Sequence, residues 1–135
     1  MGRFDFTVSD DFINTLGRLS EVDKVAPMMI NETLPTVSSY IKTGFESAGH
    51  PYSDGDLIKS IKEKPAALDR NGGWKGISRP TGKDDRGVRN MEKLAYYEYG
   101  TSRQPARPIM DKIRNDVAGP AEENMRKVFE REMKL

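Results

Sequence analysis

The sequence contains no cysteine and only one histidine among its 135 residues. Without cysteine there are no disulfide bonds, no thiolate catalysis and no cysteine-ligated zinc or iron–sulfur site. The histidine, His50, precedes a proline and has no further ligands at a suitable spacing, so we interpret it as a turn residue. No apolar run approaches the roughly 20 residues of a membrane-spanning helix, and the N-terminus shows no signal-peptide core. We therefore expect a protein that is made and used in the cytoplasm.

Common catalytic motifs are also missing. No Gly-x-Ser-x-Gly segment occurs, and the glycines of Asn71-Gly72-Gly73 lack the Lys-Ser/Thr pair that follows in a phosphate-binding loop. Asp54 and Asp56 lie close in sequence, as do Asp84 and Asp85, and paired carboxylates can hold a catalytic metal ion. These pairs occupy separate loops without a Glu-x-Lys arrangement, which favours solvated charge over a metal site. The sequence therefore predicts no enzymatic activity, no metal and no cofactor.

Net charge is small, because 22 basic residues are balanced by 21 acidic residues to give +1. Such a balance provides no strong field for general binding to nucleic acid or membranes. One polar segment nevertheless holds several basic residues and forms a possible docking loop: Arg79, Lys83, Arg86 and Arg89. Asp84 and Asp85 are interleaved with them and weaken the local field, so we expect contact with DNA to be incidental at most.

Hydrophobic residues make up 36% of the chain and charged residues 32%, which fits one modest domain spanning residues 1–135. Alternating apolar residues over 3–8 predict a short strand, followed by a helix to about residue 19. From about Glu21 to Ala48, apolar residues keep a helical spacing. This spacing survives Pro27 and Pro35, which predicts one kinked helix.

The middle of the chain favours strands and turns. Strands are predicted over 57–63, 66–70 and 74–78, with a tight turn at Asn71-Gly72-Gly73 between the last two. The polar segment at about 79–92 has no apolar face to bury, which predicts a mobile loop.

The C-terminal third combines a predicted strand with a long helix. Leu94–Tyr99 is rich in aromatic residues and predicts a strand, and Gly100 permits a turn after it. Helical spacing runs from Pro108 to about Met133, and it nearly keeps its phase across Gly119-Pro120, which predicts one bent helix. We expect an α+β fold: a small, mainly antiparallel sheet with the kinked N-terminal helix and the long C-terminal helix packed on one face.

The predicted strand over 94–99 should have one buried side. Glu98 is costly to bury unpaired, so we expect it to lie outside or against a neighbouring subunit, together with Leu94 and Tyr96. Tyr97 and Tyr99, with Ala95, would then face the helices.

Two segments resemble a known family. Tyr97-Glu98-Tyr99-Gly100-Thr101-Ser102, followed by Pro105-Ala106-Arg107-Pro108, resembles the "(V/Y)E(F/Y)GTS…PARPF" signature of phage tail-completion proteins, with Ile109 in place of the final Phe. His50–Ile61 resembles that family's "APxxTGxLRxSI", with His50 in place of Ala and Asp54 in place of Thr. The resemblance extends over roughly residues 22–125, and neither motif is a catalytic signature.

This resemblance implies a structural role. Members of this family join heads to tails in long-tailed bacteriophages and related prophages. The implied function is to complete the tail, or to join it to the head connector, as part of an oligomeric ring. The implied partners are other copies of the chain, the tail terminator or tail-tube protein and the head connector proteins. The implied location is the host cytoplasm during assembly and then the virion. The implied motif and interaction residues are Gly55, Leu57, Ser60, Tyr96, Glu98, Gly100, Thr101, Arg107 and Pro108.

Two other classes of function remain open at this point. One is a small nucleic-acid-binding module or metal-dependent nuclease, for which the basic loop and a cluster of three tyrosines over 96–99 provide the motivation. The other is a monomeric regulatory binding domain of the host. Salt-sensitive retention of DNA, or cleavage of DNA with magnesium or manganese, would favour the first of these.

Overall fold

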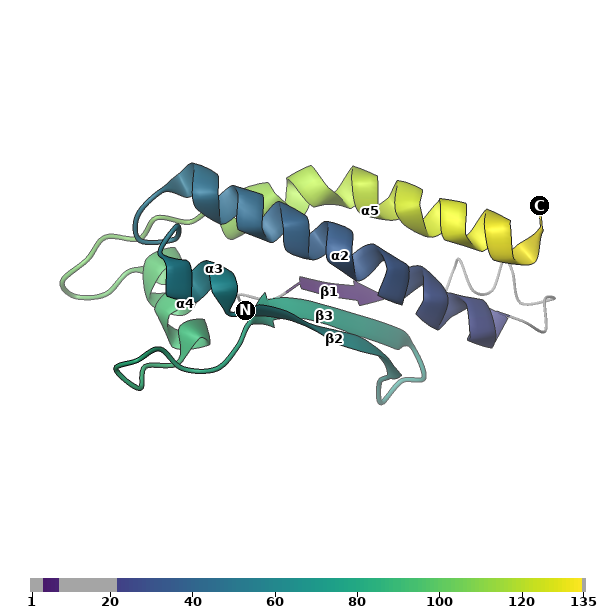
Figure 1. Ribbon diagram of the computed structural model, residues 1–135, viewed down its shortest axis with the longest axis horizontal. Coiled ribbons are helices and arrows are strands. Elements are labelled where there is room, and N and C mark those ends of the chain that lie inside the picture. The colour runs from purple at the N-terminus through teal and green to yellow at the C-terminus, as the bar shows by residue number, and fades with distance from the viewer. Residues whose placement is uncertain (1–3, 8–21, 135) are drawn as a thin grey trace.

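The computed structural model describes residues 4–7 and 22–134 of the chain. In Figure 1, a long helix lies between a small sheet and a second long helix. The predicted α+β class is confirmed, and the helix expected over residues 9–19 lies outside the described residues. In chain order the elements are β1 (Phe4–Thr7), α2 (Val22–Ala48), α3 (Gly55–Lys59), β2 (Ile61–Leu68), β3 (Trp74–Pro80), α4 (Asn90–Tyr99) and α5 (Met110–Met133).

The sheet is antiparallel throughout, with strand order β1-β3-β2. The predicted turn at Asn71-Gly72-Gly73 joins β2 to β3. The Asp69 Oδ1 atom accepts hydrogen bonds from the backbone N–H of Asn71 at 2.8 Å and of Gly73 at 2.9 Å. Gly72 has a φ of 81°, a value that a residue with a side chain rarely adopts. The predicted hairpin is therefore confirmed.

The predicted boundaries of the first hairpin strand were wrong. Instead of separate strands over 57–63 and 66–70, one strand, β2, covers both intervals in part, and Leu57 lies in the short helix α3. The pairing of β2 with β3 shifts register between Lys64 and Ala67. Pro65 falls in this bulge and has no N–H to donate, so it breaks the period-2 pattern that marks a strand in the sequence.

The prediction of one long N-terminal helix is confirmed by α2, which contains both Pro27 and Pro35. Its apolar stripe is buried, with Ile30, Val37 and Phe45 all fully inaccessible to solvent. Burial of such a stripe along the helix offsets the roughly 3 kcal/mol that each interior proline costs.

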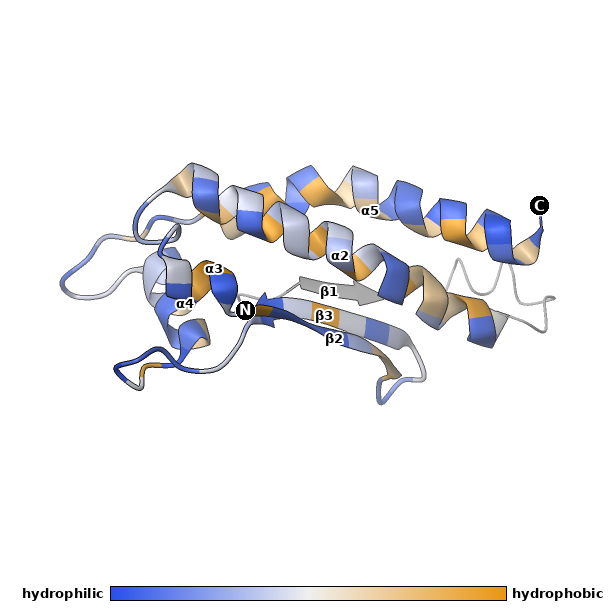
Figure 2. Cartoon of the chain, viewed as in Figure 1, coloured by the Kyte–Doolittle hydropathy of each residue, from blue (hydrophilic) through white to orange (hydrophobic). Residues whose placement is uncertain are grey.

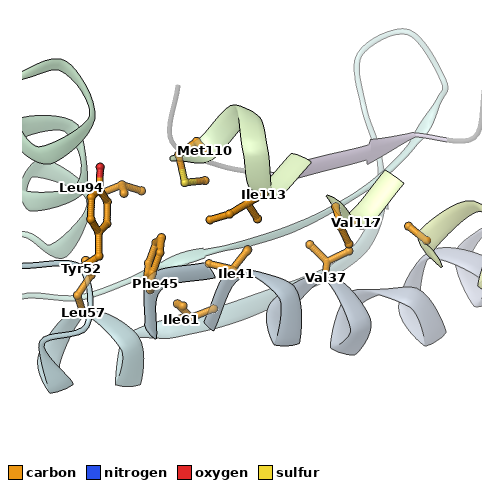
Figure 3. Packing of buried hydrophobic residues seen from close by; sticks show 11 residues of the cluster. Val37, Ile41, Phe45, Tyr52, Leu57, Ile61, Leu94, Met110, Ile113 and Val117 are labelled. Carbon is orange, nitrogen blue, oxygen red and sulfur yellow. The ribbon is translucent and has the colours of Figure 1, made fainter. Parts of the chain in front are cut away.

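The largest core cluster lies where α2 meets α5, α3, α4 and the start of β2 (Figure 3). The two long helices approach closely at Gly44, where an ideal Cβ atom would lie 2.5 Å from Ile113 Cγ1. Helix α5 continues through Gly119 and Pro120, so the prediction of one helix rather than two is confirmed, although it begins at Met110 rather than Pro108. The cluster consists of Val37, Ile41, Phe45, Tyr52, Leu57, Ile61, Leu94, Met110, Ile113, Val117 and Ala121.

Two smaller clusters extend the core along α2. One places Ile30 and Leu34 against Trp74 of the hairpin, and the other packs Met29 against Phe129 of α5. Apolar and polar residues alternate around both long helices in Figure 2, and no described helix is long and apolar enough to span a bilayer.

The predicted strand over Leu94–Tyr99 is a helix, α4. Leu94 is fully buried and Glu98, one turn later, is 8% exposed, whereas Tyr99 is 65% exposed. The predicted faces were therefore wrong for Leu94, Glu98 and Tyr99. They were right for Tyr97, which packs against the largest core cluster, and for Tyr96, which is 45% exposed. The aromatic residues suggested a strand, but the preceding Met-Glu-Lys-Leu-Ala run has strong helix propensity.

Candidate functional site

The α4–α5 junction is defined here as residues 97–110 together with Tyr52. It brings into contact the two segments singled out in the sequence, residues 50–61 and 97–108. Glu98 is its centre. The Glu98 Oε1 atom accepts hydrogen bonds from the backbone N–H groups of Ile109 at 2.7 Å and Met110 at 3.0 Å. These N–H groups begin α5 and have no partner within their own helix. A carboxylate from α4 therefore caps α5 and complements the positive end of its dipole.

Tyr52 connects the upstream segment to this cap. Its hydroxyl oxygen lies 3.0 Å from Glu98 Oε1 and 2.7 Å from the backbone oxygen of Arg107, and its hydroxyl proton is directed to these acceptors. The ring is fully buried, with centroids 5.4 Å from both Phe45 and Tyr97. Burial, reinforced by the charge of Glu98, raises the pKa of Tyr52 well above its usual value. Tyr52 therefore remains a neutral donor at physiological pH.

Arg107 has the corresponding role at the C-terminal end of a different helix, α2. Its guanidinium Nη1 donates to the backbone oxygen of His50, and its Nη2 donates to the backbone oxygen of Ala48 at 3.3 Å. Ala48 is the last residue of α2, whose terminal carbonyls lack helical partners. A cation at this position satisfies the carbonyls and complements the negative end of the helix dipole.

Gly100 makes the turn between these two charged caps possible. It ends α4 with a φ of 79°, and an ideal Cβ atom at this position would lie only 2.7 Å from the backbone nitrogen of Ala106. Thr101 then exchanges backbone hydrogen bonds with Gln104, which closes a tight turn. The predicted turn at Gly100 is confirmed, although it follows a helix instead of a strand.

The structure gathers most of the motif residues at or near this junction. Glu98, Gly100, Thr101, Arg107 and Pro108 all lie within it. From the upstream segment, Leu57 belongs to the same core cluster, Gly55 begins α3, and Ser60 Oγ donates to the backbone oxygen of Leu57 at 2.6 Å. Tyr96 does not belong to the network, because it is 45% exposed on the outer side of α4.

Sequence reasoning missed Tyr52 as the link between the two segments. The available signal was its place as the aromatic residue within His50–Ile61. His50 itself lies in a turn, as predicted, and its Nδ1 is 3.0 Å from Asp54 Oδ1 on the exposed surface. Among the described residues, no group of three or more histidine and carboxylate side chains is placed to bind a metal ion.

The segment predicted as a polar loop over 79–92 is shorter than expected, since α4 begins at Asn90. Its turn is organised around Asp84, whose Oδ1 accepts the backbone N–H groups of Arg86 and Val88, each at 2.9 Å. Asp84 Oδ2 also lies 3.2 Å from Lys93 Nζ, and both side chains are largely shielded from solvent. The Val88 N–H and the Lys93 ammonium lower the pKa of Asp84 against the opposing effect of burial. The mobility of this segment stays a prediction.

The four basic residues of the predicted docking loop separate into two pairs. Arg79 and Arg89 line one small hollow at the C-terminal end of β3, together with Thr81, Gly82 and neighbouring apolar residues. Lys83 and Arg86 lie in the exposed turn between them.

Comparisons of the chain with protein-family models, with curated proteins and with solved structures gave no match.

Proposed function

We propose that this chain is a structural, non-enzymatic protein of a phage or prophage head–tail junction. In this role it completes the tail, or joins it to the head connector, as part of an oligomeric ring. Its partners are other copies of itself, the tail terminator or tail-tube protein and the head connector proteins. It acts in the host cytoplasm during assembly and afterwards in the virion.

One observation carries the proposal. The two segments that resemble tail-completion proteins are far apart in sequence, yet they meet through specific hydrogen bonds. Tyr52 contacts Glu98, and Arg107 contacts the backbone of Ala48 and His50. Two separate resemblances meet in one hydrogen-bond network. This supports an architecture shared with tail-completion proteins, because two chance matches would not be expected to contact each other in the fold.

The chemistry of the junction supports a role in shape rather than catalysis. Glu98 and Arg107 are both occupied by backbone groups at helix ends. A catalytic carboxylate or guanidinium must instead reach a substrate. The residues of the motif therefore hold α2, α4 and α5 in fixed relative positions, as a subunit that packs into a ring requires.

Deletion of the gene from its phage or prophage tests the proposal. After induction, electron microscopy should show filled heads and separate tails, and the wild-type gene supplied in trans should restore joined particles. A gene that carries Glu92→Ala, a change at an exposed residue of α4, should restore joining as well as the wild-type gene does. Normal joined particles in the deletion strain would refute the proposal.

Purified alone, the protein should be mainly monomeric or weakly associated, because the resemblance implies that ring contacts in such junctions form on a partner template. Mass photometry at micromolar concentration measures this directly. A stable closed ring without any partner would contradict this part of the proposal.

A further inference from the structure

One face of the β2–β3 hairpin has no helix packed on it among the described elements. Helix α2 covers the opposite face: an ideal Cβ atom on Gly76 would lie 2.5 Å from Ile30 Cγ2, and Ser78 shares a 2.7 Å hydrogen bond with Ser38. Since side chains alternate along a strand, Arg79 must point away from α2. Figure 1 shows the same arrangement, with α2 on one side of the hairpin only.

Basic residues lie on this second face around Ile77, which is itself only 7% exposed. Lys62 pairs with Arg79 across the two strands, and Lys64 follows two residues after Lys62 on the same face, so the backbone positions of neighbouring members are about 5 to 7 Å apart. Both lysines are exposed and Arg79 is half-buried. We define the cationic face as Lys62, Lys64, Arg79 and Arg89.

Arg79 and Arg89 converge on the same hollow, which has a volume of about 150 Å³. Neither guanidinium forms a hydrogen bond or an ion pair with a described residue, and the same holds for the ammonium groups of Lys62 and Lys64. Within the described part of the chain, no side chain competes with an anion for these groups. Guanidinium groups in particular match the two oxygens of a phosphate in a bidentate geometry.

The structure also removes an objection to anion binding here. In the sequence, Asp84 lies among the basic residues and weakens their field. In the fold, Asp84 is turned inward, accepts two backbone N–H groups and is paired with Lys93. The acidic residues that remain near the cationic face, in sequence or in strand register, are Asp85, Glu92, Asp5 and Glu63, of which Glu63 pairs with Ser78 and so lies on the α2 side of the hairpin.

From this charge complementarity we infer that the cationic face binds the phosphate backbone of double-stranded DNA without reading its sequence. Several cations without a partner among the described residues, beside a hollow, suit a repeating anion, and duplex DNA presents one negative charge per roughly 1.7 Å of its axis. This inference is independent of the proposed role in assembly, because it concerns a surface that the junction does not use.

Fluorescence anisotropy with a labelled DNA duplex tests the inference on the full chain. We expect dissociation constants of about 10⁻⁴ to 10⁻⁶ M at physiological salt, with marked weakening between about 50 and 200 mM salt. The double variant Arg79→Gln/Arg89→Gln should weaken binding about tenfold and lower the salt slope by about 2. The double variant Lys62→Gln/Lys64→Gln should act in the same direction.

The matched control is Arg126→Gln, which removes the same type of charge from α5, where Arg126 pairs with Glu123. It should leave DNA binding nearly unchanged. Equal loss in this control would show that only net charge matters and would overturn the inference, as would the absence of binding at about 50 mM salt. Competition by polyglutamate as effective as that by DNA would point to a carboxylate partner and would also overturn it. Circular dichroism verifies folding, and if the arginine variant is unfolded the lysine variant decides the test.

Discussion

The α4–α5 junction and the cationic face contain the same kinds of charged side chain in opposite situations. In the junction, Glu98 and Arg107 are engaged with backbone groups at helix ends. On the cationic face, Arg79 and Arg89 have no partner among the described residues. Charge in the first region therefore holds the fold together, whereas charge in the second region is available to another molecule. A charged residue in this chain can be assigned a role only after its partners are known.

This contrast predicts opposite responses to mutation. Removing Glu98 from the junction leaves shielded backbone groups without partners, and each such group costs about 1–3 kcal/mol. Removing an exposed charge usually changes stability by less than about 0.5 kcal/mol. The following variants test the contrast, beginning with the largest expected effect.

Glu98→Ala should destabilise the protein by about 3 kcal/mol or more, because it leaves the N–H groups of Ile109 and Met110 and the hydroxyl of Tyr52 without their acceptor. This reverses the expectation from sequence, in which Glu98 lay outside the fold. Urea unfolding measures the change. Glu92→Ala on the exposed side of α4 is the control. If both variants lost the same unfolding free energy, the distinction between buried, bonded charges and exposed charges would be wrong.

Gly100→Ala should cost about 2 kcal/mol or more, because it combines a positive φ with overlap between the new Cβ and Ala106. Gly72→Ala separates these two causes, since Gly72 has a similar φ of 81° but no atom within 4 Å of the position that a Cβ atom would take. We expect the Gly72 variant to lose about 1 kcal/mol in the same unfolding experiment. Similar losses at both positions would show that close packing at Gly100 contributes little.

Tyr52→Phe should cost about 1 kcal/mol at neutral pH, because one donor to Glu98 and to the Arg107 carbonyl is lost. The variant should also change the response to alkali. The pKa of Tyr52 is raised in the folded protein, so its contribution is complete below the unfolded value of about 10 and declines as the pH rises above it. The stability of Tyr52→Phe should therefore fall less steeply above about pH 10. Tyr96→Phe, at an exposed position, should retain the wild-type slope.

Asp84→Asn should have the smallest effect on stability. The effect should depend on pH in the acidic range. The lowered pKa of Asp84 means that its contribution is present above the usual value of about 4 and is lost as the pH falls further. The variant should melt below the wild type at pH 7, and the difference should shrink as acid protonates Asp84. Asp85→Asn is the control, because Asp85 is exposed. A difference that does not depend on pH would indicate that the charge of Asp84 is not involved.

Sequence patterns predicted the long elements well and the short ones poorly. In α2, an apolar stripe repeated over 27 residues outweighed two prolines. In α4 the apolar residues on the buried face are too few to form a stripe, since Leu94 is followed one turn later by Glu98. Burial of Glu98 depends on N–H groups eleven and twelve residues away, and local periodicity contains no information about such partners. The turn at Gly100 was predictable because a positive φ is a requirement of the residue's own backbone.

The packing of α2 against α5 has a consequence for the order of events during synthesis. The Asn124 side chain donates to the backbone oxygen of Glu32, which lies 92 residues earlier in the chain. While the ribosome is still making the hairpin and α4, the side of α2 that will meet α5 therefore lacks its partner helix. At about 5–20 residues per second this interval lasts several seconds. During that time the nascent chain exposes an apolar stripe, and a chaperone or a neighbouring nascent chain can bind there before α5 arrives.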